Sequence, residues 1–268
     1  MFASGSSTAA AAPQFVPEQG AQEWISAALQ RLRTRLGPVA QTRQLITCPG
    51  GLDVPRDLDA TFDLICDLQE QVGQEDLEFT LLAHEQNQDL GDEFVALGNP
   101  TGQLMHSFHH RTQDSYLILF SDAVFRVLPV MFASIARELG RFALHRSGGP
   151  LFDDASTFQH DPESEAELAA ISMGLGVWVA NGAVMFENGC CGGGCGIDLG
   201  SLRAGLSVPE VCHALAVDGK ARGLGKWGIS RHLESTQKAA FKRNWTALKR
   251  AKPQPSLAAS ATSGALEG

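Results

Sequence analysis

The feature that most constrains the fold of this chain is an apolar segment, residues 128–144, that carries charged side chains in its middle. Hydrophobic residues occupy nearly every side of the helix that this segment predicts, so the helix is expected to be buried. Arg137, Glu138 and Arg141 stand inside it. A buried charge is costly unless it is paired and hydrogen-bonded. The segment therefore predicts a central helix with oppositely charged partners packed against it.

The three charged residues follow the spacing of a zinc-binding motif. In the hydrolase signature His-Glu-x-x-His, two imidazoles one helical turn apart hold a zinc ion, and the Glu between them acts as general base. Here the same frame reads Arg137-Glu138-Leu-Gly-Arg141. Guanidinium groups stay protonated and have no lone pair to give to a metal. The frame therefore predicts a vestigial Glu138 that no longer works with a metal-bound water.

A later segment supplies candidate partners for these arginines. Residues 161–179 predict a second helix, which begins with Asp-Pro-Glu and carries Glu163 and Glu167. We expect Arg137 and Arg141 to pair with Glu138, Glu163 and Glu167, and so to join the two helices. Two alternatives stay open: the arginines are solvated on an ordinary helix, or they hold a small anion, a carboxylate or phosphate, in bidentate fashion.

Composition excludes several classes of protein. The chain has 268 residues and a net charge of −9, so it is expected to repel nucleic acid. It has no apolar run approaching 18 residues, which argues against insertion into a membrane. The start lacks the basic region of a signal peptide, and the six cysteines are expected to be reduced, as in a cytoplasmic protein. Tails rich in Ala, Ser, Gly and Pro are expected to be disordered at residues 1–19 and 251–268, which leaves a single domain at 20–250.

Hydrophobic periodicity outlines the elements of this domain. Helices are expected at residues 23–36, 58–72, 128–144, 208–217 and 229–248, and strands at 77–84, 102–109 and 116–120. Residues 44–49 are expected to be a short strand or an extended piece. This pattern predicts an α+β fold: a small antiparallel sheet, a pair of helices packed on it, and further helices toward the C-terminus.

The order of these pieces is similar to that in an uncharacterised bacterial family related to gluzincin-type zinc metallopeptidases. The matching segments are Glu23-Trp24-Ile25, Ile135 to Arg141, Glu163 to Leu168, Gly174-Leu-Gly-Val-Trp-Val-Ala-Asn181, Leu206 to Ala216, and Lys226-Trp227 to Leu233. The resemblance covers roughly residues 20–250, and its most specific piece is the Gly-Leu-Gly segment.

This resemblance implies a zincin-like helix pair. It implies that the zinc-ligand positions are those of Arg137, Arg141 and Glu167, with Glu163 as a supporting acid. Because both histidine positions are arginine, it implies the fold without the activity and without a cofactor. The expected role is that of a pseudoenzyme that binds or scaffolds a protein partner, whose identity the sequence does not give.

A displaced metal site is a further alternative, which would keep the protein a metal-dependent hydrolase. His145 lies one turn beyond Arg141, and His160 lies shortly before Glu163. With Glu167 these histidines would form a shifted His/carboxylate site. The competing interpretation is that both histidines are ordinary residues at the edges of loops.

The cysteines offer another set of ligands. The Cys190–Cys195 segment is rich in Cys and Gly, and a following helix carries Cys212 and His213. Cys191, Cys195, Cys212 and His213 together would supply four ligands for a structural zinc. Against this, adjacent residues such as Cys212 and His213 rarely bind one metal, because their side chains diverge. A flexible hairpin with incidental thiols is the competing interpretation.

Overall fold

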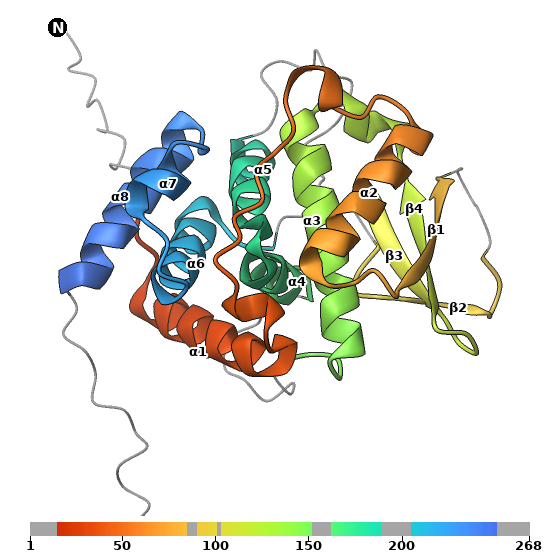
Figure 1. The fold of residues 1–268 in the computed structure, drawn as a ribbon, viewed down its shortest axis with the longest axis horizontal. Coiled ribbons are helices and arrows are strands. Elements are labelled where there is room, and N and C mark those ends of the chain that lie inside the picture. Colours follow the sequence, from red (N-terminus) through yellow and green to blue (C-terminus); the bar gives the residue numbers. More distant parts are fainter. Residues whose placement is uncertain (1–14, 85–89, 101–102, 152–161, 189–204, 251–268) are drawn as a thin grey trace, which may run out of the picture.

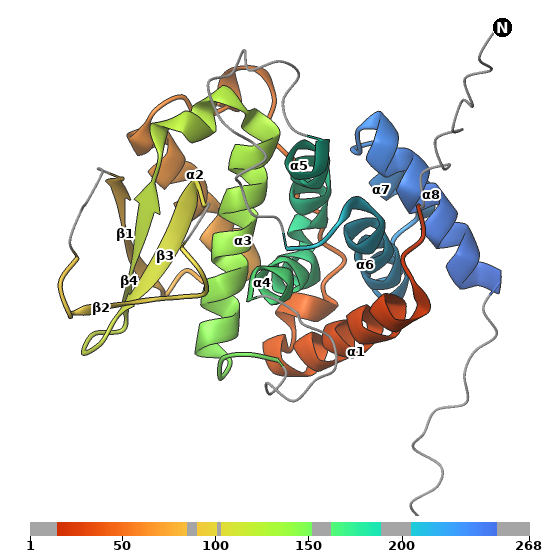
Figure 2. The same ribbon diagram turned by 180° about the vertical axis from the view of Figure 1, so that it is seen from behind.

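The computed structural model describes residues 15–84, 90–100, 103–151, 162–188 and 205–250. The helices are α1 (Gln19–Leu36), α2 (Leu58–Val72), α3 (Leu128–Arg146), α4 (Pro162–Ala170), α5 (Gly176–Asn188), α6 (Val208–Ala221), α7 (Lys226–Ser230) and α8 (Ser235–Arg250). The strands are β1 (Glu78–Ala83), β2 (Phe94–Ala96), β3 (Met105–His110) and β4 (Ser115–Phe120). The sheet lies at one end of the molecule, and α3 separates it from α4 and α5 (Figures 1 and 2). The α+β prediction is thus confirmed.

The sheet is mixed, so the prediction of an antiparallel sheet is wrong. Its strand order is β1-β4-β3-β2, and β1 runs parallel to β4. The other two pairs are antiparallel, with Ser107 opposite Ile118 and Val95 opposite His109. Strands β2, β3 and β4 form a meander, and β1 joins the free side of β4. Alternation along the chain predicts that a strand exists, but it does not predict which distant strand lies beside it.

Helix α2 begins and ends where its sequence predicts. Asp57 precedes it, and its carboxylate accepts a hydrogen bond from the backbone N–H of Ala60 at 2.8 Å. Gly73 ends it in the left-handed conformation, with φ of 70°, and donates to the last carbonyls of the helix. A capping aspartate and a terminal glycine are strong boundary signals, and the range predicted for this helix is confirmed.

Helix α3 is the centre of the fold. All of its residues from Val130 to Leu144 are buried, the charged ones included. It packs against α4 and α5 and also touches β3. Gly140 allows the approach to α4, because a β-carbon at this position would overlap the carbonyl of Ala166. The burial expected for this segment is therefore confirmed.

The single helix expected at residues 161–179 is broken at the Gly-Leu-Gly segment. A π-helical turn, Ile171–Leu175, separates α4 from α5, and Gly174 has a φ of 99°. The carbonyl of Gly174 accepts a hydrogen bond from the N–H of Ile46 at 3.0 Å. Of the two alternatives for residues 44–49, a short strand or an extended piece, the structure has the extended piece, which passes this kink and pairs with none of the described strands.

The helix expected at residues 229–248 is two helices, α7 and α8. Asn181 of α5 holds the turn between them: its amide donates to the carbonyl of His232 at 3.0 Å and accepts from the N–H of Glu234 at 3.1 Å. One side chain thus satisfies backbone groups on both sides of the break. The sequence pattern of residues 229–248 does not reveal this contact, because its cause lies on another helix.

The packed region extends upstream of residue 20. The side-chain amide of Asn244 donates to the carbonyl of Phe15 at 2.8 Å, and the guanidinium of Arg243 lies 4.6 Å from the centre of the Phe15 ring. The approach to α1 is therefore attached to α8. Among the helices of the described ranges, none has the combination of length and apolar character that a bilayer crossing requires.

Candidate functional site

Two facing helices bring five charged side chains together in the interior. Helix α3 contributes Arg137, Glu138 and Arg141, and α4 contributes Glu163 and Glu167, which are one turn apart. We call these five residues the α3–α4 charge cluster. Each of them is at most 4% exposed. The expectation that the two arginines are solvated is therefore wrong, and the cluster must be judged by how its charges are paired.

Arg137 is bound to α4 and to the loop before β3. Its Nε and Nη2 atoms donate to Oε1 of Glu167 at 3.1 and 2.7 Å, and Nη1 donates to the side-chain oxygen of Gln103 at 2.6 Å. Glu167 also accepts hydrogen bonds from the backbone N–H groups of Gly205 at 3.3 Å and Leu206 at 2.7 Å. The pair thus joins α3, α4 and the approach to α6.

Arg141 is bound on three sides. Its Nε lies 3.1–3.2 Å from the oxygens of Glu138, Nη2 donates to Glu163 at 3.2 Å, and Nη1 donates to the carbonyl of Leu97 at 3.0 Å. Burial by itself would lower the pKa of Arg141, but the carboxylates of Glu138 and Glu163 outweigh it and raise that pKa. Glu138 also accepts a hydrogen bond from the hydroxyl of Ser107 on β3 at 2.5 Å.

The loop between β2 and β3 closes over this cluster. Besides the Leu97 carbonyl, the N–H of Asn99 donates to Glu163 at 3.3 Å. Gly98 lies between them with a φ of 85°, and a β-carbon there would overlap the guanidinium of Arg141. The backbone of this loop therefore lies directly against the arginine, at a point where only glycine fits.

The side chains of the cluster do not fit a zinc ion. Zinc sites in proteins use imidazole, thiolate and carboxylate ligands. Here three carboxylates are present, but the guanidinium groups of Arg137 and Arg141 lie among them and form ion pairs with their oxygens. A metal ion at this place would have to share those oxygens with two permanent positive charges.

One buried histidine near the cluster is uncharged. His106 on β3 is 4% exposed, and neither of its ring nitrogens has a hydrogen-bond partner among the described residues. Burial lowers its pKa to about 4, against the opposing influence of Glu138. Sequence analysis assigned this histidine no role, because strand alternation alone does not show how deeply a residue is buried.

The shifted His/carboxylate site is not assembled in the described structure. His145 lies at the end of α3, where its Nδ1 is 2.9 Å from the hydroxyl of Tyr116 and its ring lies 4.3 Å from that of His109. His160 is outside the described residues, and Glu167 is engaged by Arg137. Burial lowers the pKa of His145, and the neighbouring His109 lowers it further. The sequence did not predict that His109 and His145 would be neighbours. His109 lies opposite Tyr116 in the pairing of β3 with β4, and Tyr116 contacts His145.

The proposed cysteine site is only half described. Cys191 and Cys195 lie outside the described residues. Cys212 and His213 are buried in α6 and contact α8: the thiol donates to the carbonyl of Gln237 at 3.4 Å, and Nδ1 of the histidine is 3.1 Å from the side-chain oxygen of Asn244. Within the described ranges, no group of three or more His, Cys, Asp and Glu residues is placed to hold a metal ion.

A second buried ion cluster joins α1 to α6, and sequence analysis missed it. Asp218 pairs with Arg222 at 2.7 Å and with Arg33 at 3.3 Å. Burial raises the pKa of Asp218 despite these two arginines, and burial also lowers the pKa of Arg222. The available signal was the spacing of four residues between Asp218 and Arg222, which places them on one face of a helix.

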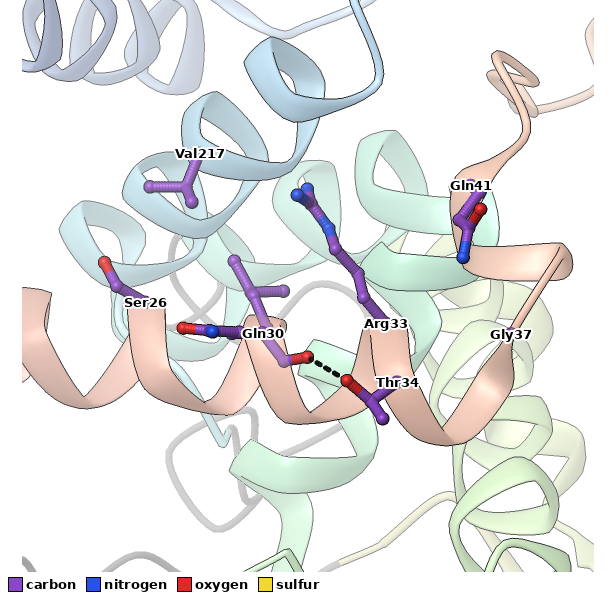
Figure 3. Close-up of a pocket in the computed structure, with 8 residues that line it drawn as sticks. Ser26, Gln30, Arg33, Thr34, Gly37, Gln41 and Val217 are labelled. Atoms are coloured by element: carbon purple, nitrogen blue, oxygen red, sulfur yellow. Dashed lines mark hydrogen bonds between the residues drawn. The ribbon is translucent and has the colours of Figure 1, made fainter. Parts of the chain in front are cut away.

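A groove of about 650 Å³ lies beside this second cluster, between α1 and α6. Figure 3 shows Arg33 extending from α1 toward α6, with Ser26, Gln30 and Gln41 around the groove. Arg33 is the charged residue of the lining, and it is already paired with Asp218. The lining offers hydrogen-bonding groups but no pair of residues suited to acid–base chemistry.

Comparison with models of protein families, with curated proteins and with solved structures gives no match for this chain. Function is therefore inferred from the side chains themselves. The α3–α4 charge cluster is the strongest basis for this inference, because five charged side chains are buried together there and pair with one another across two helices.

Proposed function

We propose that this protein is a catalytically inactive relative of zincin-like metallopeptidases, with a binding or scaffolding role for a protein partner. The observation that carries the proposal is the engagement of Arg137 by Glu167 and of Arg141 by Glu138 and Glu163. Both histidine positions of the motif frame hold guanidinium groups, and their hydrogen bonds go to the carboxylates nearby. Positive charge comes from the chain, in place of a metal ion.

The role of Glu138 follows from its contacts. A general base in this motif acts on a water that a metal has made acidic. Glu138 has Arg141 and Ser107 as partners instead, and it is buried. In the proposal it positions Arg141 and ties α3 to β3, and no reaction step is assigned to it.

The anion-sensor alternative has less support. A bidentate anion site needs guanidinium groups that face a cavity with free N–H bonds. Arg141 uses Nε, Nη1 and Nη2 for contacts within the protein, and Arg137 uses the same three atoms. Three carboxylates also surround the two arginines, so an added anion would be repelled.

The location and partner class form part of the same proposal. A cytoplasmic protein without a nucleic-acid partner fits the acidic composition, and Cys48, Cys66 and Cys212 are free thiols. The displaced-site hydrolase is the competing function, since His160 of that site lies outside the described residues, as do Cys191 and Cys195 of the separate cysteine site.

Hydrolysis assays test this proposal. We would measure the cleavage of fluorogenic peptide mixtures by the full chain with added zinc, with and without a chelator. We expect no chelator-sensitive cleavage. Chelator-sensitive cleavage that disappears in His145→Ala or Cys191→Ser would overturn the proposal in favour of the displaced site. A melting temperature that rises with phosphate or succinate in the native chain, but not in Arg141→Ala, would instead support an anion sensor.

A further inference from the structure

The negative charge of the chain is concentrated in one stretch. Residues 51–95 contain thirteen Asp and Glu residues and one arginine, so this stretch alone is more negative than the whole chain, whose net charge is −9. It includes α2, β1 and β2, which lie at the sheet end of the molecule (Figure 1). A concentrated charge of one sign attracts partners of the opposite sign.

This acidic end contains an open strand edge. β1 pairs with β4 on one side, and no strand of the described residues pairs with its other side. Glu78, Thr80, Leu82 and Ala83 are exposed along the six residues of the strand. β1 lies at the periphery in both views of the ribbon (Figures 1 and 2). Such an edge presents backbone N–H and C=O groups to any extended chain that approaches it.

A groove of about 550 Å³ lies between α2 and the start of β1, and Gln113 and Ser115 at the start of β4 also line it. Its apolar part is a stacked pair, Phe62 and Phe79, whose ring centres are 4.8 Å apart. Glu70, Glu75 and Glu78 also line the groove, are exposed, and form no ion pair with a described residue. The groove therefore combines an aromatic floor, a negative rim and an open strand edge.

We propose that the open edge of β1 binds an extended, basic segment of a partner protein by strand addition. Main-chain hydrogen bonds to β1 would supply part of the affinity, and alternate side chains of the segment would point into the groove. Apolar side chains would contact Phe62 and Phe79, and Lys or Arg would pair with the glutamates of the rim. The proposal rests on the binding role proposed above and names the partner's chemistry.

Two other occupants fit this surface less well. A second copy that paired through its own β1 would bring two acidic rims together, and like charges facing each other across strands are destabilising. The chain itself also has a basic stretch, residues 226–250, which could in principle occupy the groove. It forms α7 and α8, however, and these helices lie at the opposite end of the molecule (Figure 1). A basic extended segment from another protein satisfies both the charge and the strand edge.

A synthetic peptide tests the proposal. The probe is a fluorescein-labelled peptide of alternating Arg and Val, roughly seven residues long, so that it spans β1. Binding to the full chain is measured by fluorescence anisotropy, and amide hydrogen exchange of residues 78–83 is measured with unlabelled peptide. We expect saturable binding, slower exchange in β1, and weaker binding as salt is raised. A peptide of the same sequence with every backbone nitrogen methylated should bind at least about tenfold more weakly, because neither of its edges can donate hydrogen bonds to β1.

Matched variants separate specific binding from general attraction. Glu75→Gln with Glu78→Gln should weaken binding by about three- to tenfold. Glu18→Gln with Glu234→Gln removes the same charge from exposed residues elsewhere and should leave the affinity unchanged. Equal binding of the methylated peptide, no protection of β1, or no binding at all would overturn the proposal. Self-association of the Glu75/Glu78 variant without peptide binding would also overturn the proposal. The two glutamates would then serve only to prevent edge-to-edge association of β1 with other chains. These results are independent of hydrolysis and metal content, so failure here leaves the pseudoenzyme proposal to its own test.

Discussion

The protein buries two clusters of arginine and carboxylate, and they differ in how well their charges are compensated. In the α3–α4 charge cluster, neighbouring carboxylates raise the pKa of Arg141 despite its burial. In the α1–α6 cluster, burial has the larger effect on both partners: it raises the pKa of Asp218 and lowers that of Arg222. Opposite charges thus outweigh burial for Arg141, whereas burial outweighs opposite charges for Asp218 and Arg222.

This difference shows what Arg137 and Arg141 accomplish in the interior. Buried carboxylates on α4 would be costly without a cation. Two arginines supply that cation from within the chain and connect α3 to α4 and to the loop that covers them, while Glu138 connects α3 to Ser107 on β3. The second cluster lies beside an open groove, where Arg33 is partly exposed to water. The α3–α4 charge cluster is therefore best explained as a structural layer of ion pairs between two helices.

Breaking the first cluster should have the largest effect. Arg137→Met leaves Glu167 buried without its cation and should lower the free energy of unfolding by about 3–5 kcal/mol. Adding Glu167→Gln should restore part of this loss, because Gln keeps an oxygen for the N–H groups of Gly205 and Leu206. Urea unfolding measures both. Arg146→Met is the control, since its pair with Asp76 is exposed and should be worth about 0–1 kcal/mol. Equal costs for Arg137→Met and Arg146→Met would contradict the account.

Lowering the pH should destabilise the fold through His106, which lies near the same cluster. Its folded-state pKa of about 4 is below the ordinary value of 6.5, so the folded protein favours the neutral ring. Stability is then lost as pH falls from about 6.5 toward 4, by about 3 kcal/mol for this group. His106→Leu should remove this part of the pH dependence. Unfolding free energies at pH 7 and pH 4 for both proteins check it, and identical losses would show that His106 does not titrate as described.

The loop over the cluster should tolerate little change. Gly98→Ala strains a left-handed residue and forces Arg141 to move, at a cost of about 2 kcal/mol. Gly91→Ala is the matched control, because Gly91 also has a positive φ, of 67°, but an added β-carbon there meets nothing within 4 Å. It should cost about 1 kcal/mol. If the two substitutions cost the same in thermal unfolding, the contact between the loop backbone and Arg141 is not a close one.

Substitution in the α1–α6 cluster should have the smallest effect on the free energy of unfolding. Arg33→Met removes a partly exposed partner of Asp218 while Arg222 remains at 2.7 Å, so the loss should be at most about 1 kcal/mol. Chemical denaturation at neutral pH measures it. A loss as large as that for Arg137→Met would mean that the two clusters are equally important, which would remove the contrast between them.

Local signals predicted much of this fold. Asp57 and Gly73 mark the ends of α2, and the apolar character of residues 128–144 indicates the burial of α3. These features depend on the residues next to each other in the chain. The break between α7 and α8 depends instead on Asn181, and the parallel pairing of β1 depends on β4, so neither follows from its own segment.

The site was predictable to a similar degree. A buried helix with Arg137 and Arg141 requires carboxylates, and the acidic start of α4 was the available source. The loop between β2 and β3 contains no charged residue, so its sequence does not indicate a contact with an arginine. Its contacts with Arg137 at Gln103 and with Arg141 at Gly98 depend on the path of its backbone. The Asp218–Arg222 spacing was visible, but many such pairs lie on exposed helix faces.

The metal content of the purified, tag-free full chain, measured by elemental mass spectrometry, tests the central claim most directly. If arginines have taken the place of the metal and no displaced site exists, the protein should contain only trace amounts of zinc, iron and manganese. A stoichiometric metal that is lost in His145→Ala or in Cys191→Ser would contradict the account. It would show that this chain holds a metal at a place other than the α3–α4 charge cluster.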